Sequence, residues 1–287
     1  MRVLVTGCRG QVGLEVARAL GSACEVVAHD RASLDLADAT QVAARVREAR
    51  PHVIVNAAAY TAVDRAETDF AAASAVNAVA PGVFGEECRR AGALLVHFST
   101  DYVFDGTKPS PYVESDATNP LNVYGRTKLE GERAIAASGC DHLILRTSWV
   151  YGPHGRNFLL TMLRLGAQRD ELRVVDDQRG APTSSLQLAR LTRELLLERG
   201  LERARAASGV YHATAGGETT WCGFARAIFE RQARRPRVTP IPSSEYPTPA
   251  RRPANSVLDT GRLAAALQLR LSDWQTGLDE TLAALSR

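Results

Sequence analysis

The chain lacks the features that mark membrane, secreted and metal-binding proteins. No apolar run approaches the roughly 18 residues of a membrane helix, and the opening stretch becomes turn-like at Gly7, too early for a secretion signal. The five cysteines lie far apart and show no metal-ligand spacing. We therefore expect a reduced, cytoplasmic protein that does not associate with membranes.

A strong excess of one charge is also missing. The net charge is +3 over 287 residues, and the arginines are dispersed rather than gathered in a block, so nucleic acid is not an expected partner. We find neither an internal repeat nor a low-complexity segment. Hydrophobic residues make up 45% and charged residues 23% of the chain, which is typical of a globular protein with a sizeable core.

A glycine-rich turn opens the chain. The strand-like run 3–5 leads directly into Gly7, Gly10 and Gly13, and a helical pattern follows. Glycines between a strand and a helix let the backbone approach a pyrophosphate, which then lies at the positive end of the helix. The spacing is GxxGxxG, not the commoner GxGxxG. The pattern predicts a dinucleotide-binding turn.

The second predicted strand, 25–29, ends at Asp30, about twenty residues beyond the glycines. A carboxylate at this position can bind the ribose hydroxyls of NADH. Arg31 follows it, and its guanidinium can accept the 2′-phosphate of NADPH instead. Both cofactors therefore stay open, as does the simpler interpretation of the two residues as a turn.

Strands alternate with helices over the first half, which predicts a doubly wound parallel sheet with right-handed crossovers. The expected strands are 53–55, 94–98 and 142–146, and the expected helices are 39–50 and about 66–91, with Pro81 bending or breaking the latter. We expect an α/β, Rossmann-type domain over residues 1–150. Residues 151–287 then form mainly a smaller α/β substrate-binding domain, with a segment near 170–205 returning to the first.

The second half is less regular. It predicts helices at 157–168, 186–199, 221–233, 262–267 and 277–285 and strands at 172–175 and 210–213. Between them, the proline-rich stretch 236–253 is expected to be an extended loop.

A tyrosine and a lysine four residues apart form the candidate catalytic pair. Tyr124 and Lys128 lie on one face of a predicted helix, for which Asn119 is the expected cap and Gly139 the expected stop. A nearby cation lowers the pKa of a phenol, so the pair can act as a general acid and base. Alone, the pair is weak evidence, because tyrosine and lysine four residues apart on a helix more often form part of a solvated face.

Several long phrases together with these motifs resemble a known superfamily, the extended short-chain dehydrogenases/reductases. Within it the chain is most similar to the dTDP-4-dehydrorhamnose reductase family, over its whole length. The phrases are residues 56–64, 99–104, 120–125, 146–151 and 246–253.

The resemblance implies the reduction of the 4-keto group of a nucleotide-sugar, dTDP-4-dehydro-L-rhamnose, by NADPH or NADH, in the pathway to dTDP-L-rhamnose. Tyr124 would donate the proton, Lys128 would lower its pKa and hold the nicotinamide ribose, and Thr100 would hydrogen-bond the same oxygen. The implied cofactor contacts are Gly7, Gly10, Gln11, Val12, Gly13, Asp30, Arg31, Asp35, Leu36, Ala59, Tyr60, Thr61, Tyr124 and Lys128. The implied substrate contacts are Thr100, Asp101, Trp149, Trp221 and Arg251.

One departure from the family concerns a metal. Some members are described with Mg²⁺ held by glutamates between two subunits, and Glu15 matches one of them. The second is expected after Thr183, where residues 184–187 contain no acid. A magnesium site at Glu15 is therefore doubtful but stays open, as does a homodimer, and we regard Glu15 as a surface helix residue.

Two other function classes remain. A related nucleotide-sugar epimerase or dehydratase would retain its NAD⁺ and need no added reductant. A non-catalytic relative, such as the reductase-like subunit that binds methionine adenosyltransferase, would be expected to lack part of the trio Thr100, Tyr124 and Lys128, which is complete here.

Overall fold

A six-stranded sheet forms the centre of the protein in the computed structural model, which describes residues 1–286. All its pairings are parallel, and the strand order is β10-β5-β4-β3-β1-β2. The strands are β1 Arg2–Thr6, β2 Glu25–His29, β3 Val53–Asn56, β4 Leu94–Thr100, β5 His142–Thr147 and β10 Gly209–His212. The predicted doubly wound α/β fold is confirmed.

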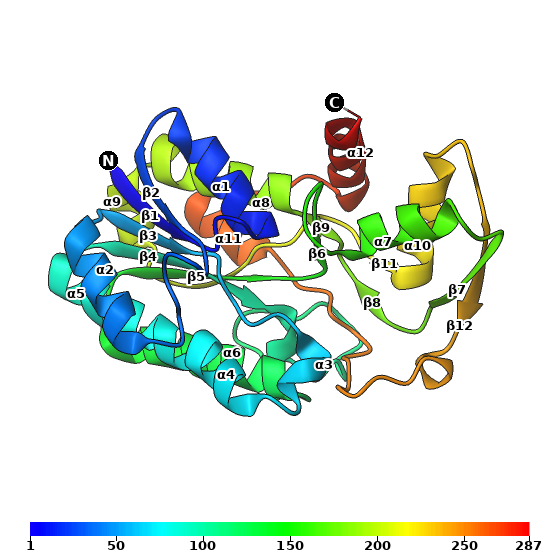
Figure 1. Ribbon diagram of the computed structural model, residues 1–287, viewed down its shortest axis with the longest axis horizontal. Helices are drawn as coiled ribbons and strands as arrows, with labels where there is room; N and C mark the ends of the chain where they lie inside the picture. Colours follow the sequence, from blue (N-terminus) through cyan, green and yellow to red (C-terminus); the bar gives the residue numbers. More distant parts are fainter. Residues whose placement is uncertain (287) are drawn as a thin grey trace.

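Helices cover both faces of this sheet (Figure 1). One face packs against α1 Gln11–Gly21, α8 Ser185–Arg193, the π-helical η3 Glu194–Glu198, α9 Leu201–Ala206 and α11 Gly261–Leu267. The other packs against α2 Ala39–Ala49, α5 Ala80–Ala91 and α6 Val123–Ser138. Successive strand residues point to opposite faces, so Val3 and Val5 join the first core and Leu4 the second. Both faces are therefore apolar, as in most parallel sheets.

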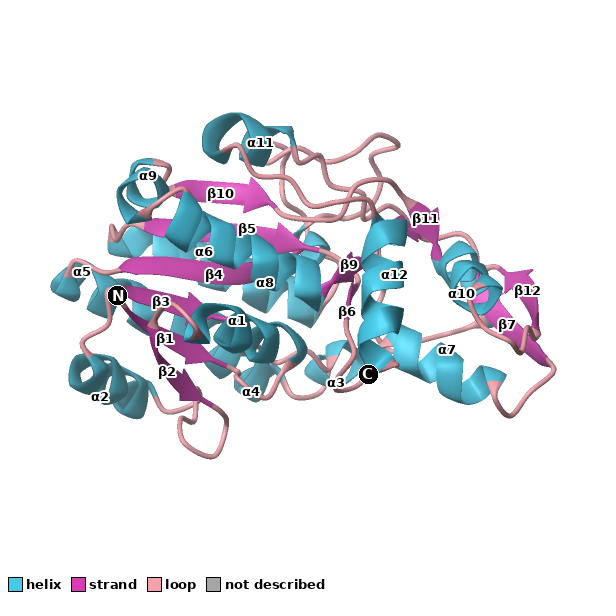
Figure 2. Cartoon of the chain, turned by 90° about the horizontal axis from the view of Figure 1, so that it is seen from above, coloured by secondary structure: helices cyan, strands magenta, loops and turns pink. Residues whose placement is uncertain are grey.

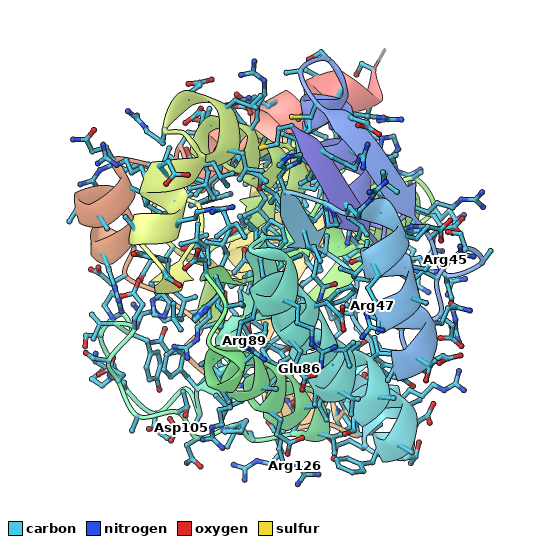
Figure 3. All side chains as sticks on the ribbon, turned by 90° about the vertical axis from the view of Figure 1, so that its left-hand side faces the viewer. Arg45, Arg47, Glu86, Arg89, Asp105 and Arg126 are labelled. Atoms are coloured by element: carbon cyan, nitrogen blue, oxygen red, sulfur yellow. The ribbon has the colours of Figure 1, made fainter. Side chains whose placement is uncertain are left out.

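The outer side of the second helical layer is charged. Figure 3 looks onto α2 and α5 and labels Arg45, Arg47, Glu86 and Arg89 there. Arg47 pairs with Glu87 at 2.6 Å. The Glu87 carboxylate is buried and also pairs with Arg90 at 2.7 Å, so these arginines cover a buried charge, while the exposed pair of Arg45 with Glu48 contributes little to stability.

The helical stretch 63–91 is divided, and one interruption lies directly before its proline. It consists of α3 Val63–Ala66, α4 Phe70–Ser74, a π-helical turn η1 Ala75–Val79, and α5. Pro81 lies in the first turn of α5, where a missing N–H is tolerated. The predicted interruption near Pro81 is therefore present, and it takes the form of the π turn, which contains Asn77, the residue whose carbonyl would otherwise bond residue 81.

A second, smaller cluster of elements lies beside the carboxyl edge of the sheet (Figures 1 and 2). Its helices are α7 Phe158–Gly166, α10 Trp221–Glu230 and α12 Trp274–Leu285, which share one apolar core. Its paired strands are β7 Glu171–Val175 with β12 Arg237–Ile241, β8 Arg179–Gly180 with β11 Thr219–Thr220, and β6 Val150–Tyr151 with β9 Thr183–Ser184. The domain boundary near residue 150 stays a prediction.

Two local expectations need correction. The stretch 236–253 is not one extended loop, because it contains β12 and the 3₁₀ turn η4 Ser243–Glu245. Pro240 is tolerated in β12 because this sheet has only two strands. The cap of α6 is Asn122, not Asn119: its side chain accepts a hydrogen bond from the Gly125 amide at 2.8 Å. The predicted stop is confirmed, since Gly139 is left-handed with φ 71°.

Among residues 1–286 no helix is long and apolar enough to cross a membrane.

Candidate functional site

The site lies where the parallel strands end. β4 delivers Thr100 to this edge and continues into the 3₁₀ turn η2 Asp101–Val103, and β1 and β3 deliver the glycine turn and the segment after Asn56. The start of α6 lies beside η2, because Gly125 packs so closely there that an added Cβ would lie 2.1 Å from the Tyr102 carbonyl oxygen. Only a glycine allows this contact, which brings Tyr124 next to η2.

The glycine turn has the geometry that a dinucleotide requires. Gly7 is left-handed at φ 68°, and a Cβ on Gly13 would lie 2.3 Å from the Gly7 carbonyl oxygen. Gly10 caps α1, and no side chain occupies the first amides of this helix within the described chain. Amides of this kind at a helix amino end bind phosphate. The turn therefore fits the diphosphate of NAD(P)H, which the family implies.

Gln11 and Val12 lie in the first turn of α1. The Gln11 side chain accepts a hydrogen bond from Asn157 Nδ2 at 2.9 Å, so it links the cofactor turn to α7. Its backbone amide stays the group expected to meet the diphosphate.

Asp30 is held in a tight turn. Its Oδ1 accepts hydrogen bonds from the Ala32 and Ser33 amides at 3.1 and 3.0 Å, and these bonds hold the pKa of the carboxyl below its usual range. Arg9 pairs with its other oxygen at 2.7 Å, whereas Arg31 is exposed. Arg9 is thus a second cation beside the expected ribose position. The sequence did not indicate it, because Arg9 and Asp30 are far apart in the chain and meet only in the fold.

Two residues assigned to the adenine differ in environment. Leu36 is 7% exposed and belongs to the core, while Asp35 is exposed and its carboxylate accepts a hydrogen bond from the Ala37 amide at 3.0 Å. Their contact with a cofactor stays a prediction.

The segment Ala59–Thr61 is fixed by a residue that the sequence analysis did not identify. Asn77, in the π turn η1, accepts a hydrogen bond from the Tyr60 amide at 2.8 Å and donates to the Tyr60 carbonyl at 3.2 Å. It also donates to Thr127 Oγ1 on α6 at 3.2 Å. Asn77 thereby fixes the expected nicotinamide side of the site relative to the helix that carries Tyr124. A π turn inside a long helix is a common mark of a functional position, but it does not show in sequence periodicity.

The phenol of Tyr124 keeps its proton at neutral pH. Burial raises its pKa to about 12, Asp101 adds to the shift, and the Thr100 side chain opposes it. The expectation that a neighbouring cation lowers this pKa is wrong for this structure, because desolvation is the larger effect and Lys128 makes other contacts. Tyr102 packs edge-on against the ring at 5.6 Å. A protonated phenol is suited to donate a proton.

Lys128 is buried, at 1% exposure. Its Nζ donates to the Phe98 carbonyl at 2.7 Å and lies 3.1 Å from His97 Nε2. Burial lowers its pKa to about 8, although Glu132 one turn later opposes the shift. The predicted solvated helix face is therefore excluded for this residue. His97 was not expected in the site, since its place in an apolar strand is typical of a core residue.

Asp101 is buried beside Thr100. The Thr100 hydroxyl donates to Asp101 Oδ1 at 3.0 Å, and burial raises the pKa of Asp101 to about 6. A buried carboxyl with a raised pKa next to a candidate acid is a common feature of functional sites.

Two tryptophans expected in the substrate pocket lie together. The rings of Trp149 and Trp221 stack with centroids 3.7 Å apart and 7° between planes. Trp149 has a positive φ of 49°, and a Cβ on Gly180 would lie 2.5 Å from its ring. A backbone strain of this kind, held by close packing, is typical of functional positions.

The loop around Arg251 is attached to the site at two points. The Arg251 carbonyl oxygen accepts a hydrogen bond from Nδ2 of Asn122, the residue that caps α6, at 2.8 Å. Arg252 pairs with Asp64 through both guanidinium ends, at 3.1 and 2.9 Å. The Arg251 side chain itself is exposed. Arg252 is thus a structural cation, and Arg251 stays the one expected to meet a ligand.

Glu15 is not a surface residue, because it is 8% exposed. Its carboxylate lies 3.3 Å from Arg18 and 3.2 Å from His154. The interpretation as a surface helix residue is therefore wrong, and its partners are an arginine and a histidine rather than acids.

The comparisons with known proteins agree over the full chain. The family model described as RmlD substrate binding domain matches residues 1–287. A dTDP-4-dehydrorhamnose reductase of Burkholderia thailandensis is 50% identical over 285 residues, covering 96% of each chain.

Two solved structures are equally informative. The dTDP-4-dehydrorhamnose reductase of Clostridium acetobutylicum is 38% identical, covers 100% of both chains and has a TM-score of 0.93. That of Bacillus anthracis, solved in complex with NADP, is 35% identical, covers 99% of both chains and has a TM-score of 0.92.

Proposed function

We propose that this chain, which belongs to the family of dTDP-4-dehydrorhamnose reductases, reduces the 4-keto group of dTDP-4-dehydro-L-rhamnose with NADPH or NADH through Thr100, Tyr124 and Lys128. The observation that carries the residue assignment is the half-buried Tyr124 at the edge of the sheet, beside Thr100, with a phenol that keeps its proton. The nucleotide-sugar is thus the proposed partner, and the enzyme is an NAD(P)H-dependent oxidoreductase.

The nicotinamide supplies a hydride when bound. A ketone that accepts a hydride becomes an alkoxide, and positioned donors stabilise that charge. Tyr124 provides the proton, because its phenol keeps it up to a pKa of about 12. Thr100 provides a second hydroxyl, which Asp101 and the Tyr102 amide orient. The free amides at the start of α1 would hold the cofactor phosphates, and Lys128 lies one turn after Tyr124 on the same helix.

The activity has a direct test. Purified protein should consume NADPH or NADH when dTDP-4-dehydro-L-rhamnose is added and should form dTDP-L-rhamnose. A related epimerase or dehydratase would instead copurify with NAD⁺ and convert its substrate without added reductant, and a regulatory subunit would bind ligand without turnover.

The second half supplies the rest of the proposed substrate site. We assign residues 151–287 mainly to substrate binding, with Trp149 and Trp221 as the aromatic surface and Arg251 as the phosphate contact. A cytoplasmic location and a homodimer without bridging metal are part of the same proposal.

We expect both reduced cofactors to work, with modest discrimination. Asp30 favours the ribose hydroxyls of NADH, but its carboxylate already pairs with Arg9, and Arg9 and Arg31 can both turn toward a 2′-phosphate. Steady-state kinetics with each cofactor measures the ratio. A preference above roughly 10³, about 4 kcal/mol, would show that a single one of these residues decides the choice.

Replacing Arg251 by alanine should raise the substrate KM about tenfold or more. A charge-assisted contact to a diphosphate contributes about 1.5–3 kcal/mol, and the loop that carries Arg251 is already fixed at Asn122 and Asp64. The cofactor KM should hardly move, since its phosphates bind at Gly10.

Arg252→Ala is the matched control. It removes a cation from the same loop, but this cation pairs with Asp64. The substitution should therefore loosen the loop, and its effect should not be confined to substrate binding. If Arg251→Ala affects both ligands equally, or neither, this loop is not part of the substrate site.

A further inference from the structure

A chain of buried polar side chains leads from the middle of the sheet to Lys128. Thr6, Asn56 and His97 lie side by side in the parallel register of β1, β3 and β4, and none is more than 2% exposed. Thr6 Oγ1 donates to Asn56 Oδ1 at 2.6 Å, Asn56 Nδ2 lies 3.0 Å from His97 Nδ1, and His97 Nε2 lies 3.1 Å from Lys128 Nζ. The proposed mechanism uses only the last of these four residues.

The hydrogen bonds of this chain run in one direction. The Ala58 amide donates to Thr6 Oγ1 at 3.3 Å, which leaves the Thr6 hydroxyl free to donate to Asn56. Their separation of 2.6 Å suits an O–H···O bond and is short for N–H···O, so the nitrogen of the Asn56 amide faces His97. An amide nitrogen only donates, hence His97 Nδ1 accepts, and the neutral imidazole carries its hydrogen on Nε2.

That Nε2–H group faces the lysine. An ammonium group has three hydrogens and no lone pair, so it cannot accept this hydrogen bond, whereas a neutral amine can. Lys128 Nζ also donates to the Phe98 carbonyl at 2.7 Å. A neutral Lys128 therefore satisfies both contacts and keeps one N–H for the ligand side.

The surrounding charges are compatible with this arrangement. Burial and Lys128 hold the pKa of His97 well below its usual range, so the imidazole is neutral. Glu132 on α6 favours the charged lysine, but it forms a bidentate pair with Arg146, and burial still brings the pKa of Lys128 down to about 8. Tyr124, on the turn before, keeps its proton.

We propose that Thr6, Asn56 and His97 form a directed hydrogen-bond chain that favours the uncharged form of Lys128, which makes His97 a positioning residue. The protonation pattern stands independently, while its effect on turnover rests on the function proposed above. A lysine that changes charge near neutral pH can release a proton on the same helix face as Tyr124 and take it back. His97 stabilises the state in which that proton has left.

The first test is the tautomer of His97. Nitrogen NMR of ¹⁵N-histidine-labelled protein distinguishes protonated from unprotonated ring nitrogens, and the His97 signals are those absent from a His97→Leu variant. We expect an unprotonated Nδ1 and a protonated Nε2 at pH 9, above the pKa of about 8 at which Lys128 loses its proton. The reverse pattern, or a doubly protonated ring, would overturn the proposal.

The second test uses the scarcity of lysine. The chain has only two, Lys108 and Lys128, so in a Lys108→Arg background a single labelled lysine side chain reports the titration of Lys128. His97→Leu removes the facing N–H and should raise the midpoint by about one pH unit, a tenfold change in the ionisation constant. If His97 instead accepts from the ammonium, the same variant lowers the midpoint.

A third variant acts through His97 without removing it. Asn56→Asp offers only acceptors to Nδ1, which forces the hydrogen onto Nδ1 and turns Nε2 into an acceptor for the ammonium. The Lys128 midpoint should rise by about one unit or more, and the rise should shrink in the Asn56→Asp, His97→Leu double variant. A rise that persists unchanged there is a direct effect of the new charge and contradicts the chain.

Turnover provides the last readout. The limb of the pH–rate profile that reports Lys128 should move with the NMR midpoint in His97→Leu, whereas a purely structural role would lower the rate and leave the profile in place. Because the NMR measurements need no turnover, a wrong tautomer overturns this inference alone. Absence of reductase activity overturns the proposed function alone.

Discussion

Replacing Tyr124 by phenylalanine should lower turnover by a factor of about 10² or more, the usual scale for a positioned acid or base. The ring stays, so its edge-on packing against Tyr102 and the fold should be unchanged, and cofactor binding should be nearly so. Only the proton that the alkoxide needs is removed. Single-turnover kinetics with saturating NADPH measures the loss, and fluorescence titration checks cofactor binding.

Tyr211→Phe is the matched control. Tyr211 lies on β10, an edge strand of the sheet, and the substitution removes a phenol hydroxyl that donates to the Ala207 carbonyl. Its turnover should stay within a few-fold of the wild type. Lys128→Met should behave like Tyr124→Phe, with a further loss in cofactor affinity. A folded Tyr124→Phe sample that keeps most of its activity would show that another group is the acid.

Replacing Glu132 by alanine should destabilise the protein by about 3–5 kcal/mol, the cost of leaving one buried charge without its partner. Glu132 and Arg146 are both 4% exposed. Arg146 donates to Glu132 through Nε and Nη2, at 3.0 and 2.7 Å, and Ser99 donates to the same carboxylate. The guanidinium also lies over the Phe104 ring at 5.2 Å, so it cannot turn to water. Urea unfolding gives the change in free energy.

Glu130→Ala, two residues earlier on α6 and only partly buried, should cost far less. Replacing Glu132 and Arg146 together by methionine should recover much of the stability, because no unpaired charge is then left. A loss below about 1 kcal/mol for Glu132→Ala would mean that Arg146 finds another partner.

The sequence was sufficient for the features that depend on local chemistry. The alternation of apolar strands and helices predicted the parallel sheet, and Gly7, Gly10 and Gly13 predicted the tight turn, because each depends on neighbours in the chain. The stop of α6 at Gly139 follows from the same kind of rule, since glycine adopts the left-handed conformation at little cost.

The sequence could not predict features that depend on contacts between distant parts of the fold. Either Asn119 or Asn122 can cap a helix, and the packing of Gly125 against Tyr102 is part of what places the helix start at the second. The direction of the Tyr124 pKa shift also failed, because sequence spacing shows a nearby lysine but not the burial that outweighs it. Asn77 and His97 were missed for the same reason: their roles exist only through partners 17 to 50 and 31 residues away.

The π turn η1 acts as a one-residue insertion in an otherwise regular helix. Deleting one residue from Ala75–Val79 would restore an ordinary α-helix, and each residue advances such a helix by about 100°. The residues before the deletion would therefore rotate by that angle relative to α5. Asn77 could then no longer face both the Tyr60 backbone and Thr127. The shortened helix would gain regularity, yet the segment Ala59–Thr61 would be free to move independently of Tyr124.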